Sequence, residues 1–225
     1  PRVVAAVQEQ SETLMHAMGD VYPNPPRIRL MERLAHRAAG ELSQCILTSG
    51  GAEAVEAALK TAALASGRSG VLAFTGSYHG LSYGALAVSH YKEDFRRPFT
   101  TQLGDHVIHR PYGEDVAELE ALVRSSLDQD HPIGAILVEP ILGRGGQVVP
   151  PQGWLPGLRS LADRHGAVLI FDEIYTGLGR CGSWWAADAE GVVPDVVCIG
   201  KALGGGMPIS AAIARPEIMA AWGQS

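Results

Sequence analysis

Short apolar runs alternate along the chain with longer segments in which apolar residues recur at helical spacing. Some short runs are apolar at every position, as in Ala135–Val138 and Val168–Phe171. Continuous runs of this kind are typical of strands buried between two layers of helices. We therefore predict strands over Cys45–Thr48, Val71–Thr75, His106–His109, Ala135–Glu139, Val168–Asp172, Val196–Gly200 and Ile209–Ala214.

The segments between these runs predict helices. Ala52–Ser66 carries its apolar residues on one face, and Gly67 is placed to end the helix. The same spacing predicts helices over Asp115–Leu127 and Leu155–His165. The alternation of strands and helices predicts an α/β fold, a three-layer α/β/α domain around a mostly parallel seven-stranded sheet.

The first 40 residues show helical spacing, interrupted by a proline-rich turn at residues 22–26. We predict a helical arm over residues 1–40 and a single domain over residues 41–225. The chain begins with Pro1, in mid-pattern and without an initiator methionine. This beginning indicates a fragment or a processed product.

Composition and charge narrow the class of partners. Hydrophobic residues make up 46% of the 225 residues and charged residues 19%, which excludes a disordered chain. A formal net charge of −6, without any cluster of five Lys or Arg, argues against nucleic-acid binding. The apolar runs are far shorter than the roughly 20 residues of a membrane helix, so we expect no membrane partner.

The three cysteines, Cys45, Cys181 and Cys198, are widely spaced and form no Cys-x-x-Cys pair. This spacing indicates neither a disulfide framework nor a zinc site, and we expect no bound metal. Reduced thiols favour a cytoplasmic location.

Eleven of the 27 glycines form four clusters, at residues 50–51, 143–146, 177–182 and 204–206. Ser49–Ala52 joins a predicted strand to a helix, where small residues let backbone N–H groups face an anion. A phosphate site and an ordinary tight turn explain this cluster equally well. Gly177–Gly182 matches G-x-G-x-x-G, but Ser183–Trp185 is a poor start for a helix, so a dinucleotide site is the weaker interpretation.

Charged residues end three of the predicted strands. Asp172 and Glu139 follow apolar runs, at the edge where open α/β sheets bind ligands, and a structural ion pair is the alternative to a functional role. Lys201 precedes three glycines, a setting for an amine with a lowered pKa, although a lone lysine is more often solvated. An anion site, an amine and an acid together match the needs of pyridoxal phosphate.

The chain resembles the class III aminotransferases of fold type I, the ornithine and 4-aminobutyrate type. The matching stretches occur between residues 49 and 214 in the family's order. They are Ser49–Glu56 (SGGAEAVE), Gly76–Gly80 (GSYHG), Val138–Pro140 (VEP), Val149–Pro151 (VPP), Asp172–Gly177 (DEIYTG) and Gly200–Gly206 (GKALGGG).

The resemblance implies pyridoxal phosphate as cofactor and assigns catalytic roles by position. Lys201 would form the Schiff base with the cofactor and carry the proton between substrate and cofactor. Asp172 would pair with the pyridine nitrogen. Gly50, Gly51 and Ala52 would hold the phosphate through backbone N–H groups.

The resemblance also implies contacts around the cofactor ring. Tyr78 would stack on one face and Ile174 would pack on the other, while Glu139 would lie near the substrate side. A core aromatic is the alternative for Tyr78. For His79, a cofactor contact and a hydrogen-bonded, partly buried histidine are equally good interpretations.

The sequence departs from the family's pattern at three positions. Ala52 replaces a usual Thr or Ser, which removes one hydroxyl contact to the phosphate. Tyr175 stands where Gln commonly reaches the cofactor's phenolic oxygen. Arg144 replaces a residue that is usually acidic or an amide, and it is a candidate to bind a substrate carboxylate, with a loop cation at the surface as the alternative.

The resemblance implies amino transfer between an amine or amino acid donor and a 2-oxo acid acceptor, in a homodimer. Family members are much longer, so the C-terminal small domain is expected to be missing here. An aminomutase or decarboxylase would use the same residues. A dinucleotide-binding oxidoreductase, through Gly177–Gly182, and a non-catalytic fragment are the alternatives from other classes.

Overall fold

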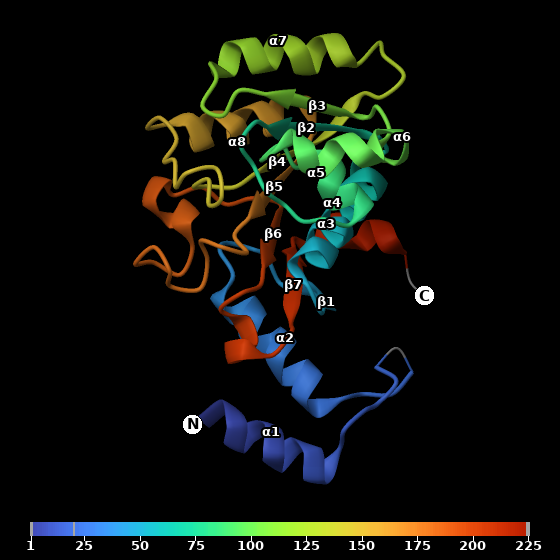
Figure 1. The fold of residues 1–225 in the computed structure, drawn as a ribbon, viewed down its shortest axis with the longest axis vertical. Coiled ribbons are helices and arrows are strands. Elements are labelled where there is room, and N and C mark those ends of the chain that lie inside the picture. The colour runs from blue at the N-terminus through green and yellow to red at the C-terminus, as the bar shows by residue number, and fades with distance from the viewer. Residues whose placement is uncertain (1, 20, 224–225) are drawn as a thin grey trace.

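A computed structural model describes residues 2–19 and 21–223, which fold around one seven-stranded sheet (Figure 1). Each predicted strand is confirmed to within two residues at either end. The strands are β1 Gln44–Thr48, β2 Gly70–Phe74, β3 Val107–Arg110, β4 Ile133–Val138, β5 Val168–Asp172, β6 Val196–Ile199 and β7 Ser210–Ala214.

The sheet has the order β1-β7-β6-β5-β4-β2-β3 and is mostly parallel, as predicted. Strands β3, β2, β4, β5 and β6 run parallel to one another. Strand β7 runs antiparallel to both β6 and β1. Four neighbouring strands, β2, β4, β5 and β6, therefore present their carboxyl ends at the same edge of the sheet.

Helices flank the sheet on both sides, and the three predicted ones correspond to α3, α7 and α8. Gly67 and Gly166 end α3 and α8 in the left-handed conformation, with φ of 66° and 59°. The α-helices are α1 Arg2–Thr13, α2 Pro25–Arg37, α3 Gly51–Ser66, α4 Tyr83–Val88, α5 Glu93–Arg96, α6 Thr100–Leu103, α7 Val116–Ser126, α8 Trp154–His165 and α9 Pro216–Met219. Short 3-10 helices occur at η1 Arg97–Phe99, η2 Ala186–Glu190, η3 Leu203–Gly206 and η4 Ala220–Trp222.

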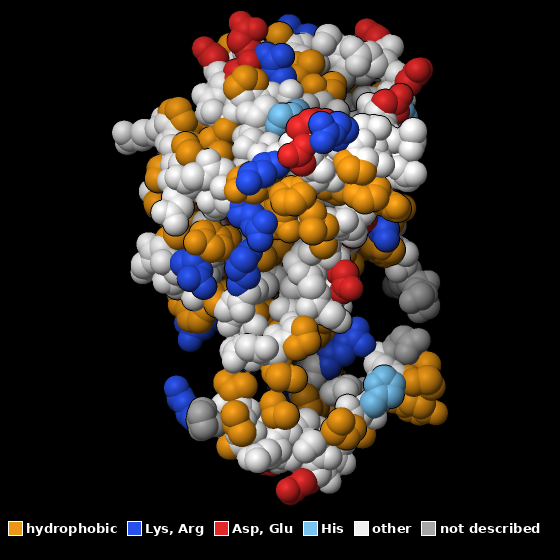
Figure 2. All heavy atoms as spheres, in the orientation of Figure 1, with side chains coloured by type: hydrophobic (Ala, Val, Ile, Leu, Met, Phe, Trp, Pro, Cys, Tyr) orange, Lys and Arg blue, Asp and Glu red, His pale blue; other side chains and the backbone are white. Residues whose placement is uncertain are grey.

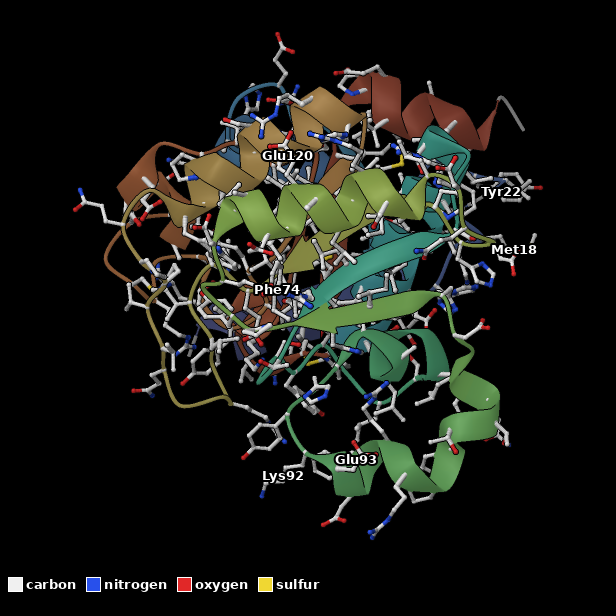
Figure 3. The ribbon with its side chains drawn as sticks, turned by 90° about the horizontal axis from the view of Figure 1, so that it is seen from above. Met18, Tyr22, Phe74, Lys92, Glu93 and Glu120 are labelled. Carbon is white, nitrogen blue, oxygen red and sulfur yellow. The ribbon has the colours of Figure 1, made fainter. Side chains whose placement is uncertain are left out.

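Alternate residues of each strand pack against opposite helix layers. In β5, Leu169 and Phe171 join a core with α7 and α8, whereas Val168 and Ile170 join a second core with α3 and α4. In Figure 3, Phe74 of β2 lies inside the molecule beneath α7. Glu120 of α7 lies toward α8 in the same view, where its carboxylate bonds side chains of α8.

Helices α1 and α2 occupy the end of the molecule opposite α7 (Figure 1). Asn24 caps the start of helix α2, where its side chain accepts the Arg27 N–H, and the helix buries Leu34. Helix α1 buries no residue, and hydrophobic side chains are exposed along it (Figure 2). The division into an arm over residues 1–40 and a domain over 41–225 stays a prediction. Within residues 2–19 and 21–223, no helix has the length and apolar character needed to cross a membrane.

Candidate active site

A cavity of about 590 Å³ opens where the carboxyl ends of β2, β4, β5 and β6 meet. Every residue that the sequence singled out for a site lines this cavity, with the exception of Gly50. The sequence analysis gave no site role to two lining residues, Gly80, which ends the Gly76–Gly80 motif, and Leu81, which directly follows it. The full lining is Gly51, Ala52, Tyr78, His79, Gly80, Leu81, Glu139, Arg144, Asp172, Ile174, Tyr175 and Lys201.

Asp172 is the last residue of β5 and is buried at the cavity floor. Its Oδ1 accepts the Ile174 N–H at 3.0 Å, and its Oδ2 lies 2.7 Å from His79 Nδ1. The His79 N–H of the backbone donates to Ser89 Oγ at 2.8 Å, which fixes the loop that carries the imidazole. Together these bonds hold the Asp172 carboxylate in one orientation.

One nitrogen of the His79 ring, Nε2, lacks a hydrogen-bond partner in the described part of the chain. This nitrogen is buried. A buried polar atom without a partner is costly, and each such atom calls for an explanation. Because His79 lines the cavity, a group bound there is one way to supply this partner.

Lys201 follows β6 and has a φ of 30°, a left-handed conformation that is uncommon for a residue with a side chain. Backbone strain of this kind is typical of functional sites. The residue stays open to solvent at the cavity, and partial burial of its amine lowers the pKa below the usual lysine value. The carboxylates of Asp172 and Glu139 oppose this lowering of the pKa.

The N-terminus of α3 faces the cavity with Gly51 and Ala52. A 16-residue helix offers backbone N–H groups and a partial positive charge at this end. Gly50 differs from these two residues because its N–H donates to Glu53 Oε2 at 3.3 Å. The phosphate role predicted for Gly50 therefore competes with an existing hydrogen bond, while Gly51 and Ala52 keep their place in the lining.

Two glycines allow close packing around this helix end. A Cβ added at Gly80 would lie 2.5 Å from Ala52 Cβ, and Gly80 has a φ of 139°. A Cβ added at Gly51 would lie 3.0 Å from Ile174 Cδ1. The loop after β2 and the side chain of Ile174 therefore press directly on the start of α3.

Glu139 follows β4, and its buried carboxylate joins two loops of the cavity wall. Its Oε1 accepts the Tyr78 N–H at 2.8 Å and its Oε2 accepts the Gly143 N–H at 2.9 Å. Burial raises the pKa of this carboxyl above its ordinary value, and the nearby Asp172 charge raises it further. Glu139 thus helps to fix the cavity wall in addition to lining it.

Glu173, next to Asp172 in the sequence, points away from the cavity. Its buried carboxylate accepts bonds from Thr176 Oγ1 and from the N–H groups of Ala186 and Ala187. It therefore organises the glycine-rich loop at 177–182. A 3-10 helix, η2, follows this loop after Trp185, so the G-x-G-x-x-G motif opens no α-helix to receive a dinucleotide.

The sequence and the fold both have relatives among known proteins. The model of the class-III aminotransferases matches residues 1–225. An acetylornithine aminotransferase of Methanopyrus kandleri is 40% identical over 222 residues, which are 99% of this chain and 54% of that protein. A putrescine aminotransferase of Pectobacterium atrosepticum is 40% identical over 224 residues, covering 97% of this chain and 47% of that protein.

Two further proteins extend this comparison. A 5-aminovalerate aminotransferase of Pseudomonas aeruginosa is 37% identical over 228 residues, covering 97% of this chain and 53% of that protein. The crystal structure of an (S)-enantioselective omega-transaminase from Thermomicrobium roseum superposes with a TM-score of 0.86 at 31% identity, covering 98% of this chain and 54% of that one. The chain thus spans about half the length of the curated relatives it matches.

Proposed function

Because the chain belongs to the class-III aminotransferase family, which uses pyridoxal phosphate, we propose that it forms the cofactor-binding half of an aminotransferase. The reaction proposed is the transfer of an amino group between an amine or amino acid and a 2-oxo acid. One observation carries this proposal, namely that the Lys201 amine and the Asp172 carboxylate line the same cavity as the N-terminus of α3.

The residues of the cavity fit pyridoxal phosphate in three respects. Gly51 and Ala52 offer backbone N–H groups for a phosphate. Lys201 offers an amine with a lowered pKa. A lower pKa increases the share of the neutral amine, and the neutral amine is the form that reacts with an aldehyde. Asp172 offers an acceptor that is held in place by His79 and Ile174. When bound, the cofactor supplies an electron sink for the carbon that loses a proton.

The proposal gives the remaining lining residues supporting roles. Lys201 Nζ would hold the cofactor and, as the amine nearest the reacting groups, would carry a proton to and from the substrate carbon. Tyr78 and Ile174 would pack on the cofactor ring, and Glu139 holds the Tyr78 loop through the Tyr78 N–H. Tyr175 lies beside Lys201, with the Lys201 Nζ 5.2 Å from its ring centroid. The Tyr175 hydroxyl would be a candidate donor to the phenolic oxygen of the cofactor.

The proposal also includes partners and setting. An amino donor and a 2-oxo acid acceptor are the proposed substrates, and a homodimer is the proposed assembly. The relatives are named for acetylornithine, 5-aminovalerate and putrescine, which makes amines and amino acids the donor class to test first. Cys45, Cys181 and Cys198 are free thiols, which supports the proposed cytoplasmic location.

An absorbance spectrum tests the proposal directly. The protein mixed with pyridoxal phosphate should show a visible band near ~420 nm, the region where this cofactor absorbs when bound to a lysine. Borohydride should then attach the cofactor to the peptide that contains Lys201. Lys201→Ala should lose the band, whereas Lys60→Ala, at an exposed position on α3, should keep it. A protein that gives no band and binds a nicotinamide dinucleotide instead would contradict the proposal.

The reaction type is tested with the loaded protein and a panel of donors. Amino transfer predicts that the nitrogen of a labelled donor reaches pyruvate or 2-oxoglutarate. Carbon dioxide release without amination of the acceptor would indicate a decarboxylase. Movement of the amino group within one molecule would indicate an aminomutase.

A further inference from the structure

Arg144 is a cavity-lining guanidinium that has no partner among the residues the structure describes. Among the described residues, no carboxylate oxygen pairs with a nitrogen of its guanidinium within 4.0 Å. Its Cζ lies 4.2 Å from the centroid of the Tyr78 ring, so the guanidinium packs on an aromatic face. Other arginines of this chain are paired, such as Arg159 with Asp195 and Arg164 with Glu120.

The backbone around Arg144 is held closely. Leu142 N–H donates to Val148 O at 3.0 Å, and Gln147 N–H donates to Gly143 O at 3.2 Å, which closes residues 142–148 into a tight loop. The Gly143 N–H is bound by Glu139, as described above. Arg144 therefore extends from a loop with a defined position.

The two glycines beside Arg144 press this loop onto the site. A Cβ at Gly143 would lie 2.8 Å from Tyr175 Cδ1, and a Cβ at Gly145 would lie 2.5 Å from Gly76 O. Only residues without side chains fit there. The loop thus packs against the segments that follow β5 and β2, and this packing brings Arg144 over Tyr78.

The charges around the cavity are arranged in two levels. The acids Asp172 and Glu139 are buried at the floor and already bond protein donors. The cations Arg144 and Arg180 are exposed, and both lower the pKa of Lys201 through their charge. Arg180 packs on Tyr175 at 5.4 Å and is not part of the lining. An anion that enters the cavity therefore meets Arg144 in addition to the Lys201 amine, which the proposed function assigns to the cofactor.

From this geometry we propose that Arg144 binds a carboxylate of the substrate and selects carboxylate-bearing substrates over uncharged amines. A planar guanidinium fixed on an aromatic face can give two parallel N–H bonds to a carboxylate, which a lysine cannot reproduce. The α3 N-terminus offers a separate place for a phosphate, so Arg144 remains for a second anion. This inference rests on the proposed function, since it names the substrate class of the same cavity.

Calorimetric titration with glutarate tests the inference, with and without pyridoxal phosphate. The unchanged protein should bind glutarate and should not bind its uncharged diamide. Arg144→Gln should weaken glutarate binding at least tenfold, about 1.4 kcal/mol. Arg144→Lys should recover only part of this loss. Added salt should weaken the unchanged protein more than Arg144→Gln, because a charge pair is screened.

Arg180→Gln is the matched control, since it removes a nearby charge that does not line the cavity. It should change glutarate affinity less than threefold. The affinity for pyridoxal phosphate should be the same in Arg144→Gln, Arg144→Lys and Arg180→Gln. This measurement distinguishes a substrate carboxylate from the cofactor's phosphate as the anion that Arg144 binds. Equal glutarate affinity in Arg144→Gln and the unchanged protein would overturn the inference. So would an absence of glutarate binding, or a loss confined to the phosphorylated cofactor.

The two proposals fail in different ways. A normal band near ~420 nm with glutarate affinity independent of Arg144 leaves the proposed function intact and removes this inference alone. Loss of the band in the unchanged protein removes the proposed function. The glutarate titration without cofactor then still measures the contribution of Arg144.

Discussion

His79 Nδ1 lies 2.7 Å from Asp172 Oδ2, and this contact joins the loop after β2 to the end of β5. Both side chains are nearly inaccessible to solvent, at 0% and 4%. The second carboxylate oxygen accepts the Ile174 N–H. Asp172 is therefore oriented by protein groups on both of its oxygens, independently of any ligand.

Replacing His79 by Phe should destabilise the fold. The change keeps a ring of similar size but removes a hydrogen bond to a buried carboxylate, which typically costs about 1–3 kcal/mol. Urea unfolding should show the loss. His36→Phe, at an exposed position of α2, is the control and should shift stability by less than about 0.5 kcal/mol. Equal stability of the two variants would show that the His79 contact contributes little.

Asp172→Asn should separate cofactor attachment from turnover. The amide has the same shape but carries no charge to pair with a protonated ring nitrogen. Borohydride should still attach pyridoxal phosphate to Lys201. The rate at which an amino donor bleaches the visible band should fall by about 10²-fold or more, the usual range for loss of a proton-handling group. An unchanged rate is the result that speaks against a role for the charge.

Glu173→Gln should destabilise the loop that follows β5. The buried carboxylate accepts bonds from Thr176, Ala186 and Ala187, and an amide would turn an N–H group toward one of these donors. An unsatisfied buried donor costs about 1–3 kcal/mol. Chemical denaturation measures this loss. Glu217→Gln, on the exposed face of α9, should be neutral.

Gly80→Ala should disrupt the start of α3, whereas Gly50→Ala should be mild. The new Cβ at position 80 would lie 2.5 Å from Ala52 Cβ in an unfavourable backbone region, while a Cβ at position 50 meets nothing within 4 Å. We expect a loss of at least about 2 kcal/mol for Gly80→Ala and under about 1 kcal/mol for Gly50→Ala. Thermal unfolding measures both. Gly50→Ala keeps the backbone N–H of position 50, so its affinity for pyridoxal phosphate does not test that N–H group. The free energy of unfolding is therefore the quantity to compare.

His109 should make the fold sensitive to mild acid. Burial, together with the positive charge of Arg96 and the neighbouring His90, lowers its pKa from 6.5 to about 4. The folded state therefore keeps His109 neutral while the unfolded state takes up a proton, so stability is lost as the pH falls from 6.5 toward 4. The loss approaches about 3 kcal/mol at the lower limit. His109→Gln should show a flatter pH profile of the urea midpoint, and parallel profiles would contradict this assignment.

The strands and the large helices were predictable because local patterns encode them. Continuous apolar runs marked β4 and β5, and Gly67 and Gly166 marked helix ends. Helix α4 was not predicted because it has only six residues, most of them buried. It therefore has no polar face that would show a helical period in the sequence. Its start depends on Glu56, whose carboxylate accepts the Gly84 N–H from a distant part of the sequence.

The site was predictable in membership but less so in its hydrogen bonds. The motifs identified almost the whole lining, since each follows a strand end. Three features depend on tertiary contacts that no local pattern records: Glu139 joining two loops, Glu173 turning away from the cavity, and Arg144 packing on Tyr78. The Gly50 hydrogen bond was readable in principle, because an acid three residues after a helix start is a capping signal.

The parallel strand order also governs the kinetics of folding. Asp172 and His79 are 93 positions apart, and their contact requires β2, β4 and β5 to pair first. Pairing of parallel strands over such separations is slow, because long loops must close before the contacts form. Local helices such as α3 and α8 form sooner. During refolding, the capacity to capture pyridoxal phosphate is therefore expected to return later than helical circular dichroism, so cofactor capture reports completion of the sheet.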